Sequence, residues 1–116
     1  MKEVEFIVEI LPEDKPVAGN AIWSGDTHYD QCVERKILDD LVGGNAWAWC
    51  SVKVTARVDG IEGTDYLGGC SHANRQDFLN SEICEGMKLI ALSELRNKLS
   101  GLVGIVKRTI EEVSNE

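Results

Sequence analysis

Residues 46–58 alternate in a way that only a β-strand explains. The even positions carry small or apolar side chains. The odd positions carry Trp47, Trp49, Ser51, Lys53, Thr55 and Arg57. Successive side chains of a strand point to opposite faces of the sheet, so the two sets lie on opposite faces. Asp59-Gly60 follows and favours a two-residue hairpin turn. The sequence therefore predicts a hairpin whose second strand runs from Ile61 to about Gly68.

The turn also fixes which residues face each other across the hairpin. The predicted pairs are Val58 with Ile61, Arg57 with Glu62, Thr55 with Thr64 and Val52 with Leu67. These are favourable cross-strand pairs. The same register places Asp65 on the apolar face opposite Val54. Either a β-bulge or a buried hydrogen bond would resolve that conflict.

Three further segments have a clear period. Residues 3–11 alternate and predict a half-buried strand. Tyr29, Val33, Ile37 and Leu41 lie four apart and form one helical stripe that ends at Gly43-Gly44. Residues 81–113 are helical in pattern and have heptad spacing at Leu92, Leu95, Leu99, Leu102 and Val106. Gly101 and Gly104 weaken this last helix and allow a break.

The order of elements is β-α-β-β-α, which indicates an α+β protein. A three-stranded antiparallel sheet with the helices packed on one face would bury both apolar stripes. We expect a single domain over residues 1–116, with residues 99–116 as a C-terminal helical extension.

Charge and composition narrow the classes of partner. The chain has 43% hydrophobic and 28% charged residues, the profile of a globular protein. Its net charge of −8 disfavours direct binding to nucleic acid or to anionic membranes and suits a basic protein partner. No signal peptide or long apolar run is evident, so we expect a cytoplasmic protein without a membrane anchor.

Few residues offer catalytic or metal chemistry. There are two histidines and no C-x-x-C pair, so no metal, cofactor or catalytic residue is predicted. One alternative site remains at the end of the hairpin. It consists of Asp65 with Cys70 and His72 of the loop from Gly68 to His72. A ligand site or small enzyme site there competes with an ordinary turn that carries a free thiol, which is the favoured interpretation.

Two surfaces are candidates for protein contacts. Trp47 and Trp49 share the polar face of the hairpin with Lys53 and Arg57, and they are either covered by another element or exposed for a partner. Coverage, by the loop at Ile22-Trp23 or by the chain after Gly69, is favoured.

The second surface is the end of the last helix. Its apolar stripe consists of Leu102, Val106, Ile110 and Val113. This stripe would extend beyond a three-stranded sheet, and a second copy of the chain could cover it, which predicts a homodimer.

Three stretches of the sequence resemble a known group of proteins. They are Pro16-Val17-Ala18-Gly19-Asn20-Ala21 with Ser24-Gly25-Asp26, then Ala46-Trp47-Ala48-Trp49-Cys50, then Tyr66-Leu67-Gly68-Gly69-Cys70-Ser71. Together they resemble small uncharacterised proteins encoded by bacteriophages, prophages and plasmids, over residues 16–98. The resemblance implies an accessory protein of a bacterial mobile element.

Two functions follow as hypotheses. The first is a non-enzymatic acidic binding protein that inhibits a host nuclease or defence complex, because carboxylates can substitute for phosphates in a basic cleft. The alternative is a small enzyme or ligand-binding protein with its site at the loop from Gly68 to His72.

Overall fold

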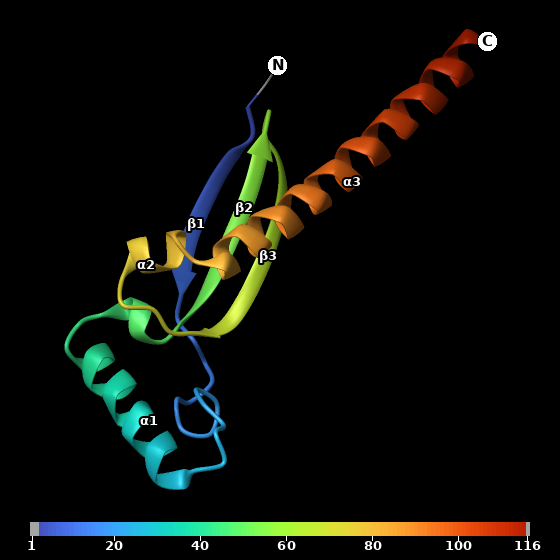
Figure 1. Ribbon diagram of the computed structural model, residues 1–116. Coiled ribbons are helices and arrows are strands. Elements are labelled where there is room, and N and C mark those ends of the chain that lie inside the picture. Colours follow the sequence, from blue (N-terminus) through green and yellow to red (C-terminus); the bar gives the residue numbers. More distant parts are fainter. Residues whose placement is uncertain (1–2, 116) are drawn as a thin grey trace.

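The computed structural model describes residues 3–115 and has the predicted class and order of elements (Figure 1). Three strands form the sheet: β1 (Glu5–Leu11), β2 (Cys50–Val58) and β3 (Ile61–Cys70). The helices are α1 (Thr27–Val42), a 3-10 turn η1 (Ala46–Ala48), the short α2 (Arg75–Leu79) and the long α3 (Glu82–Ser114). The prediction of an α+β protein with a three-stranded antiparallel sheet is confirmed.

The hairpin has the predicted register. All four predicted pairs are observed, and Asp65 does lie opposite Val54. Asp59 and Gly60 have positive φ angles of 51° and 77°, as a tight hairpin turn with the right-handed twist of the strands requires. A bulge does occur, but between Cys50 and Val52 at the far end of the ladder, so it does not relieve Asp65.

Glu13 holds the bulged end of the hairpin. Its carboxylate accepts hydrogen bonds from the Gly69 N–H (2.7 Å), the Lys15 N–H (3.1 Å) and the Ser51 hydroxyl (2.8 Å). These donors, with the Gly69 N–H foremost, keep the pKa of Glu13 below its ordinary value. The loop after β1 is thereby attached to the end of β3.

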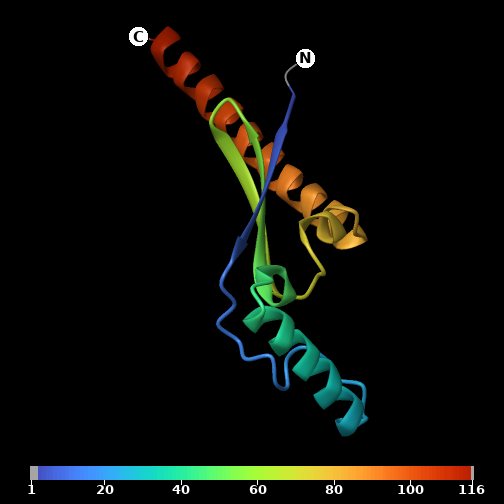
Figure 2. The same cartoon turned by 90° about the vertical axis from the view of Figure 1, so that its left-hand side faces the viewer.

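The first half of α3 packs on one face of the sheet, beside α2 (Figure 2). Cys84, Met87, Ala91 and Leu95 are buried at helical spacing against Val52, Val54 and Ala56 of the central strand. The helix backbone comes so close to β3 at Gly63 that a Cβ there would lie 2.2 Å from the Ala91 carbonyl oxygen. Only glycine permits this contact.

The expectation that both long helices cover the sheet is wrong for α1. This helix lies beyond the end of the sheet, where it contacts η1, and none of its residues is fully buried (Figure 1). The axes of three strands span roughly 10 Å. A helix with its side chains has a diameter of about 10–12 Å. One helix therefore fills a face of this sheet, and α3 already occupies it.

The resulting molecule is long and narrow. Its principal extents are 73 × 26 × 21 Å and its radius of gyration is 20.0 Å. A compact domain of this length would have a radius of gyration of about 13 Å. The two ends of the molecule are α1 and the second half of α3, which projects away from the sheet (Figure 1).

Candidate functional site

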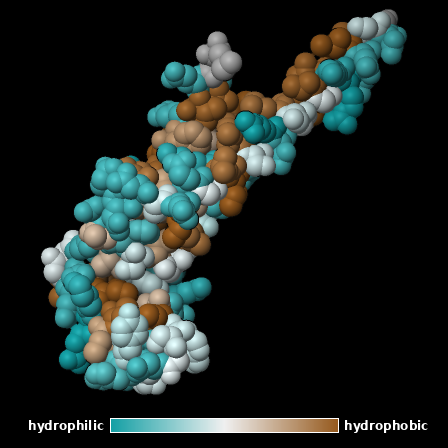
Figure 3. Space-filling model, in the orientation of Figure 1, coloured by the Kyte–Doolittle hydropathy of each residue, from teal (hydrophilic) through white to brown (hydrophobic). Residues whose placement is uncertain are grey.

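The projecting half of α3, residues 99–114, carries the apolar stripe that the sequence indicated. Leu102, Val106, Ile110 and Val113 are exposed by 44%, 54%, 59% and 68%, and Val103 and Ile105 beside them are about half exposed. Apolar side chains follow one side of this helix and hydrophilic ones follow the other (Figure 3). We call residues 99–114 the free half of α3 and residues 82–98 its packed half.

The composition of the free half is poor for a helix that stays in water. Gly101 and Gly104 each cost about 1 kcal/mol relative to alanine, and several β-branched residues add several tenths each. A helix segment of this length is marginal by itself even with good helix formers. A covering partner would supply the missing stabilisation, because most helical stability in proteins comes from packing of the apolar face.

The hypothesis of an exposed tryptophan surface is wrong. The side chain of Asn45 accepts a hydrogen bond from the backbone N–H of Trp47 (3.1 Å) and caps the start of the 3-10 turn η1. Residues 46–48 therefore do not belong to the strand. Trp49 is buried, and its indole N–H donates to the Lys15 carbonyl oxygen (2.8 Å). Trp47 stacks on Phe78 with ring centroids 5.5 Å apart. Coverage, the favoured interpretation, is therefore confirmed. Phe78, in the chain after Gly69, covers Trp47, and Trp49 is held by Lys15 of the loop after β1, which was not one of the two segments predicted.

Lys53 and Arg57 lie apart from the tryptophans, on the face of the sheet away from α3. The Lys53 ammonium is 5.6 Å from the centre of the Tyr66 ring. Arg57 forms ion pairs with Glu5 on β1 (2.9 Å) and Glu62 on β3 (3.6 Å). These two cations bridge neighbouring strands on a solvated sheet face.

The structure does not bring Asp65, Cys70 and His72 together. Asp65 and Cys70 are five residues apart along β3, roughly 16 Å at the usual rise. Cys70 is buried opposite Cys50, and its thiol lies 3.4 Å from the Leu67 carbonyl oxygen. Burial raises the pKa of Cys70, and it raises the pKa of Cys50 to about 11. Both thiols stay protonated at neutral pH, which disfavours a nucleophilic cysteine.

His72 has a different partner, which the sequence analysis missed. Its Nδ1 lies 3.4 Å from the Asp77 carboxylate, and its ring is nearly perpendicular to the rings of Trp47 and Phe78. Asp77 also accepts from the Ala73 N–H (3.0 Å), while the Asp77 N–H donates to Asn74 (2.8 Å). This reciprocal cap at the start of α2 fixes the carboxylate beside the imidazole.

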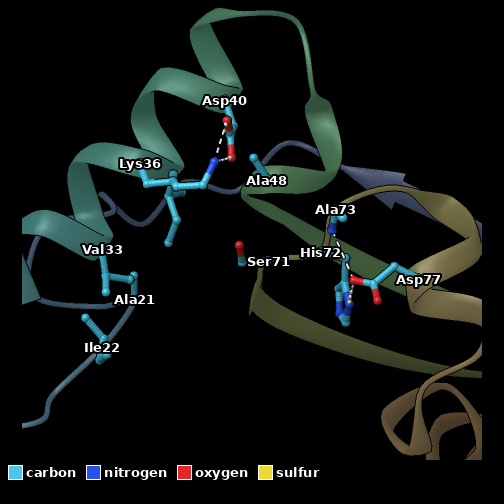
Figure 4. A pocket seen from close by; sticks show the side chains of 11 residues that line it. Ala21, Ile22, Val33, Lys36, Asp40, Ala48, Ser71, His72, Ala73 and Asp77 are labelled. Carbon is cyan, nitrogen blue, oxygen red and sulfur yellow. Dashed lines mark hydrogen bonds and ion pairs between the residues drawn. The ribbon is translucent and has the colours of Figure 1, made fainter.

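His72 and Asp77 border a cleft of about 500 Å³ between α1 and the chain that follows β3 (Figure 4). Apolar side chains from α1, from the loop before it and from η1 line one part. Lys36, paired with Asp40 at 3.2 Å, lies on the α1 wall, and Ser71 lies on the other. A mainly apolar hollow with a few converging polar groups is the usual form of a ligand pocket.

Within residues 3–115 there is no group of histidine, cysteine, aspartate or glutamate side chains arranged to hold a metal ion. None of the helices in that range combines the length and apolar character that crossing a bilayer requires. Comparisons with protein-family models, with curated proteins and with solved structures gave no match.

Proposed function

We propose that this chain is a non-enzymatic binding protein that assembles as a homodimer through the free half of α3. The observation that carries the proposal is the stripe of exposed apolar side chains at residues 102–113, on a helix that lacks the composition to stand alone. A contiguous apolar face of this kind is typical of an interface.

The heptad positions indicate how two copies would meet. Leu99, Val106 and Val113 occupy one core position of the heptad, and Leu102 and Thr109 occupy the other. In an antiparallel pair these two kinds of position face each other. Val113 of one copy then meets Leu102 of the second, and Val106 meets Thr109.

The sheet argues against a parallel arrangement. The stripe continues the helix face that carries Leu95, and the sheet covers that face as far as Leu99. In a parallel pair both sheets would lie at the same end, between the two helices. In the antiparallel pair they lie at opposite ends, and the free halves can meet along their length.

The oligomeric state tests the proposal. We expect Val106→Glu to convert the dimer to a monomer in sedimentation equilibrium, because it buries an unpaired charge in the seam. Ser100→Glu adds the same charge on another side of the helix and serves as the matched control. A wild-type chain that is monomeric at high micromolar concentration would contradict the proposed homodimer.

The direction of pairing has its own measurement. With Cys32 replaced by serine and a spin label at Ser100→Cys, the antiparallel register separates the two labelled positions by roughly 22 Å along the axis. A parallel pair would place them level along the axis, so that only the interhelical distance of about 8–10 Å and the reach of the two labels separate them. Pulsed electron paramagnetic resonance distinguishes the two values.

The partner of the dimer is the second part of the proposal. The net charge of −8 supports a basic protein partner, such as a host nuclease or defence complex bound by an accessory protein of a mobile element. Affinity capture from bacterial lysate tests this. A captured partner whose binding does not weaken between 50 and 300 mM salt would contradict charge-based recognition.

The cleft at His72 supports a second candidate function, the binding of a small ligand. Its volume suits a small molecule, and the Asp77 carboxylate orients the imidazole. In a fragment screen followed by NMR, a fragment that binds the cleft should shift the backbone amide signals of Ser71 and Ala73. Asp77→Asn should weaken such binding while Asp39→Asn does not. If no fragment in the screen shifts these signals, the hypothesis that the cleft binds a small ligand is wrong.

A further inference from the structure

Trp23 is the most exposed large apolar side chain of the described residues, at 89%. The other two tryptophans have partners within the protein, Trp47 in ring stacking and Trp49 in a partly buried hydrogen bond. Trp23 lies on the loop that leads into α1, at the end of the molecule opposite the free half of α3 (Figure 1). A large aromatic side chain in water is a strong candidate for a protein contact.

The loop that carries Trp23 is held by side-chain hydrogen bonds on both flanks. Before it, the Asn20 amide donates to the Pro16 carbonyl oxygen (2.9 Å), next to the buried Val17. After it, the Ser24 hydroxyl and N–H both donate to the Asp30 carboxylate, at 2.5 and 3.2 Å. The chain on both sides of Trp23 is therefore held before any partner arrives, which lowers the entropic cost of binding.

Carboxylates stand close to Trp23 in the chain. Asp26 caps α1 by accepting from the Tyr29 N–H (3.1 Å), and Asp30 lies in the first turn. Residues 16–42 carry five acidic side chains against two basic ones. An ionised carboxylate has about four acceptor positions, so Asp26 and Asp30 can fix the loop and still accept donors from another molecule.

We propose that Trp23, together with Asp26 and Asp30, is a contact site for an arginine side chain on a basic protein partner. A guanidinium is planar and weakly hydrated, so it stacks on an indole while its N–H groups reach carboxylates. A lysine ammonium of the same charge is more strongly hydrated and gains less. The proposal rests on the basic partner of the preceding section and names the surface and the side chain that recognise it.

The test uses the full chain and two synthetic peptides of equal charge, one with four arginines and one with four lysines, each alternating with glycine. Binding is measured by calorimetry and by tryptophan emission, where Trp23 dominates any change because Trp47 and Trp49 are covered. We expect the arginine peptide to bind more tightly than the lysine peptide. Trp23→Ala should weaken the arginine peptide about 3- to 10-fold, as a cation–π contact at a partly exposed site would.

Val42→Ala is the matched control, because Val42, the last residue of α1, is 88% exposed and has no aromatic ring. Equal binding of both peptides, equal binding by Trp23→Ala and wild type, or no binding at all would each overturn the proposal. Val106→Glu keeps this test separate from dimerisation. That variant should bind the arginine peptide with unchanged affinity per chain, and Trp23→Ala should leave the oligomeric state unchanged.

Discussion

The two halves of α3 share one heptad pattern and have different surroundings. Ala91 and Leu95 in the packed half are almost completely buried against the sheet, whereas Leu102 and Val106 in the free half, on the same face of the helix, are about half exposed. The sequence pattern is continuous across the boundary near Leu99. The sheet ends near Leu99, whereas the apolar face of the helix continues beyond it.

The difference between the halves shows which part of the apolar helix face still lacks a covering surface. A heptad stripe specifies a covered face and does not specify what covers it. The sheet of the same chain covers the packed half. For the free half we propose a second copy, and substitutions of the same kind in the two halves should therefore have opposite or unequal effects.

The largest expected effect is that of Gly63→Ala, which forces the packed half off the sheet. Its Cβ would lie 2.2 Å from the Ala91 carbonyl oxygen and 2.4 Å from the Leu95 nitrogen, both backbone atoms that cannot move without the helix. We expect a loss of at least about 3 kcal/mol in the free energy of unfolding, at or beyond the upper end for overpacking. Urea denaturation measures it, and an unchanged midpoint would show that the helix is not seated at Gly63.

Leu95→Ala should have the next largest effect. Leu95 is 1% exposed, and its truncation leaves a cavity between helix and sheet. The expected loss is about 3 kcal/mol. Leu102→Ala removes the same atoms from the free half and should cost little in dilute protein, where the proposed dimer would dissociate. Its cost should grow with protein concentration, because the proposed dimerisation would stabilise the folded chain. Equal losses for both variants at all concentrations would contradict the division of α3.

The sequence was sufficient to predict the hairpin. Its register follows from the period of two and from Asp59-Gly60, because a shift by one residue would turn Val52, Val54 and Ala56 out of the core. The prediction of a strand failed at residues 46–48, where the side chains still alternate but the backbone forms a 3-10 turn. Asn45 caps η1 at the start of that segment, and a capped turn overrides a pattern of only three residues.

The sequence could not place α1, whereas the partner of His72 could have been predicted. The stripe at Val33 and Ile37 shows that α1 has an apolar face, but it does not say that α3 has already filled the sheet. For His72 a signal was present. Asn74 and Asp77 have the spacing of a helix cap, and such a cap turns the Asp77 side chain back toward the residues before it.

A smaller effect, and of opposite sign, is expected for Gly104→Ala in the free half. No atom lies within 4 Å of a Cβ at this position, and its φ angle is not positive. The variant should stabilise the helix by about 1 kcal/mol, because alanine loses less backbone entropy than glycine. Slower amide hydrogen exchange at residues 102–110 would measure the gain. The contrast with Gly63→Ala on β3 is the sharpest form of the comparison, since one glycine-to-alanine change pushes the packed half off the sheet and the other stabilises the free half.

The smallest effect concerns the boundary between the halves, at Lys98. Its ammonium donates to the Glu62 carbonyl oxygen of β3 (2.7 Å) and pairs with Glu94 (3.2 Å), while the side chain is about half exposed. Lys98→Met keeps most of the stem and removes the charge, and we expect it to cost about 0.5 kcal/mol. Lys107→Met makes the same change in the free half and is the control. If Lys98 anchors the last turn of the packed half, its loss should also speed hydrogen exchange around Leu99, whereas a purely local salt bridge would leave that exchange unchanged.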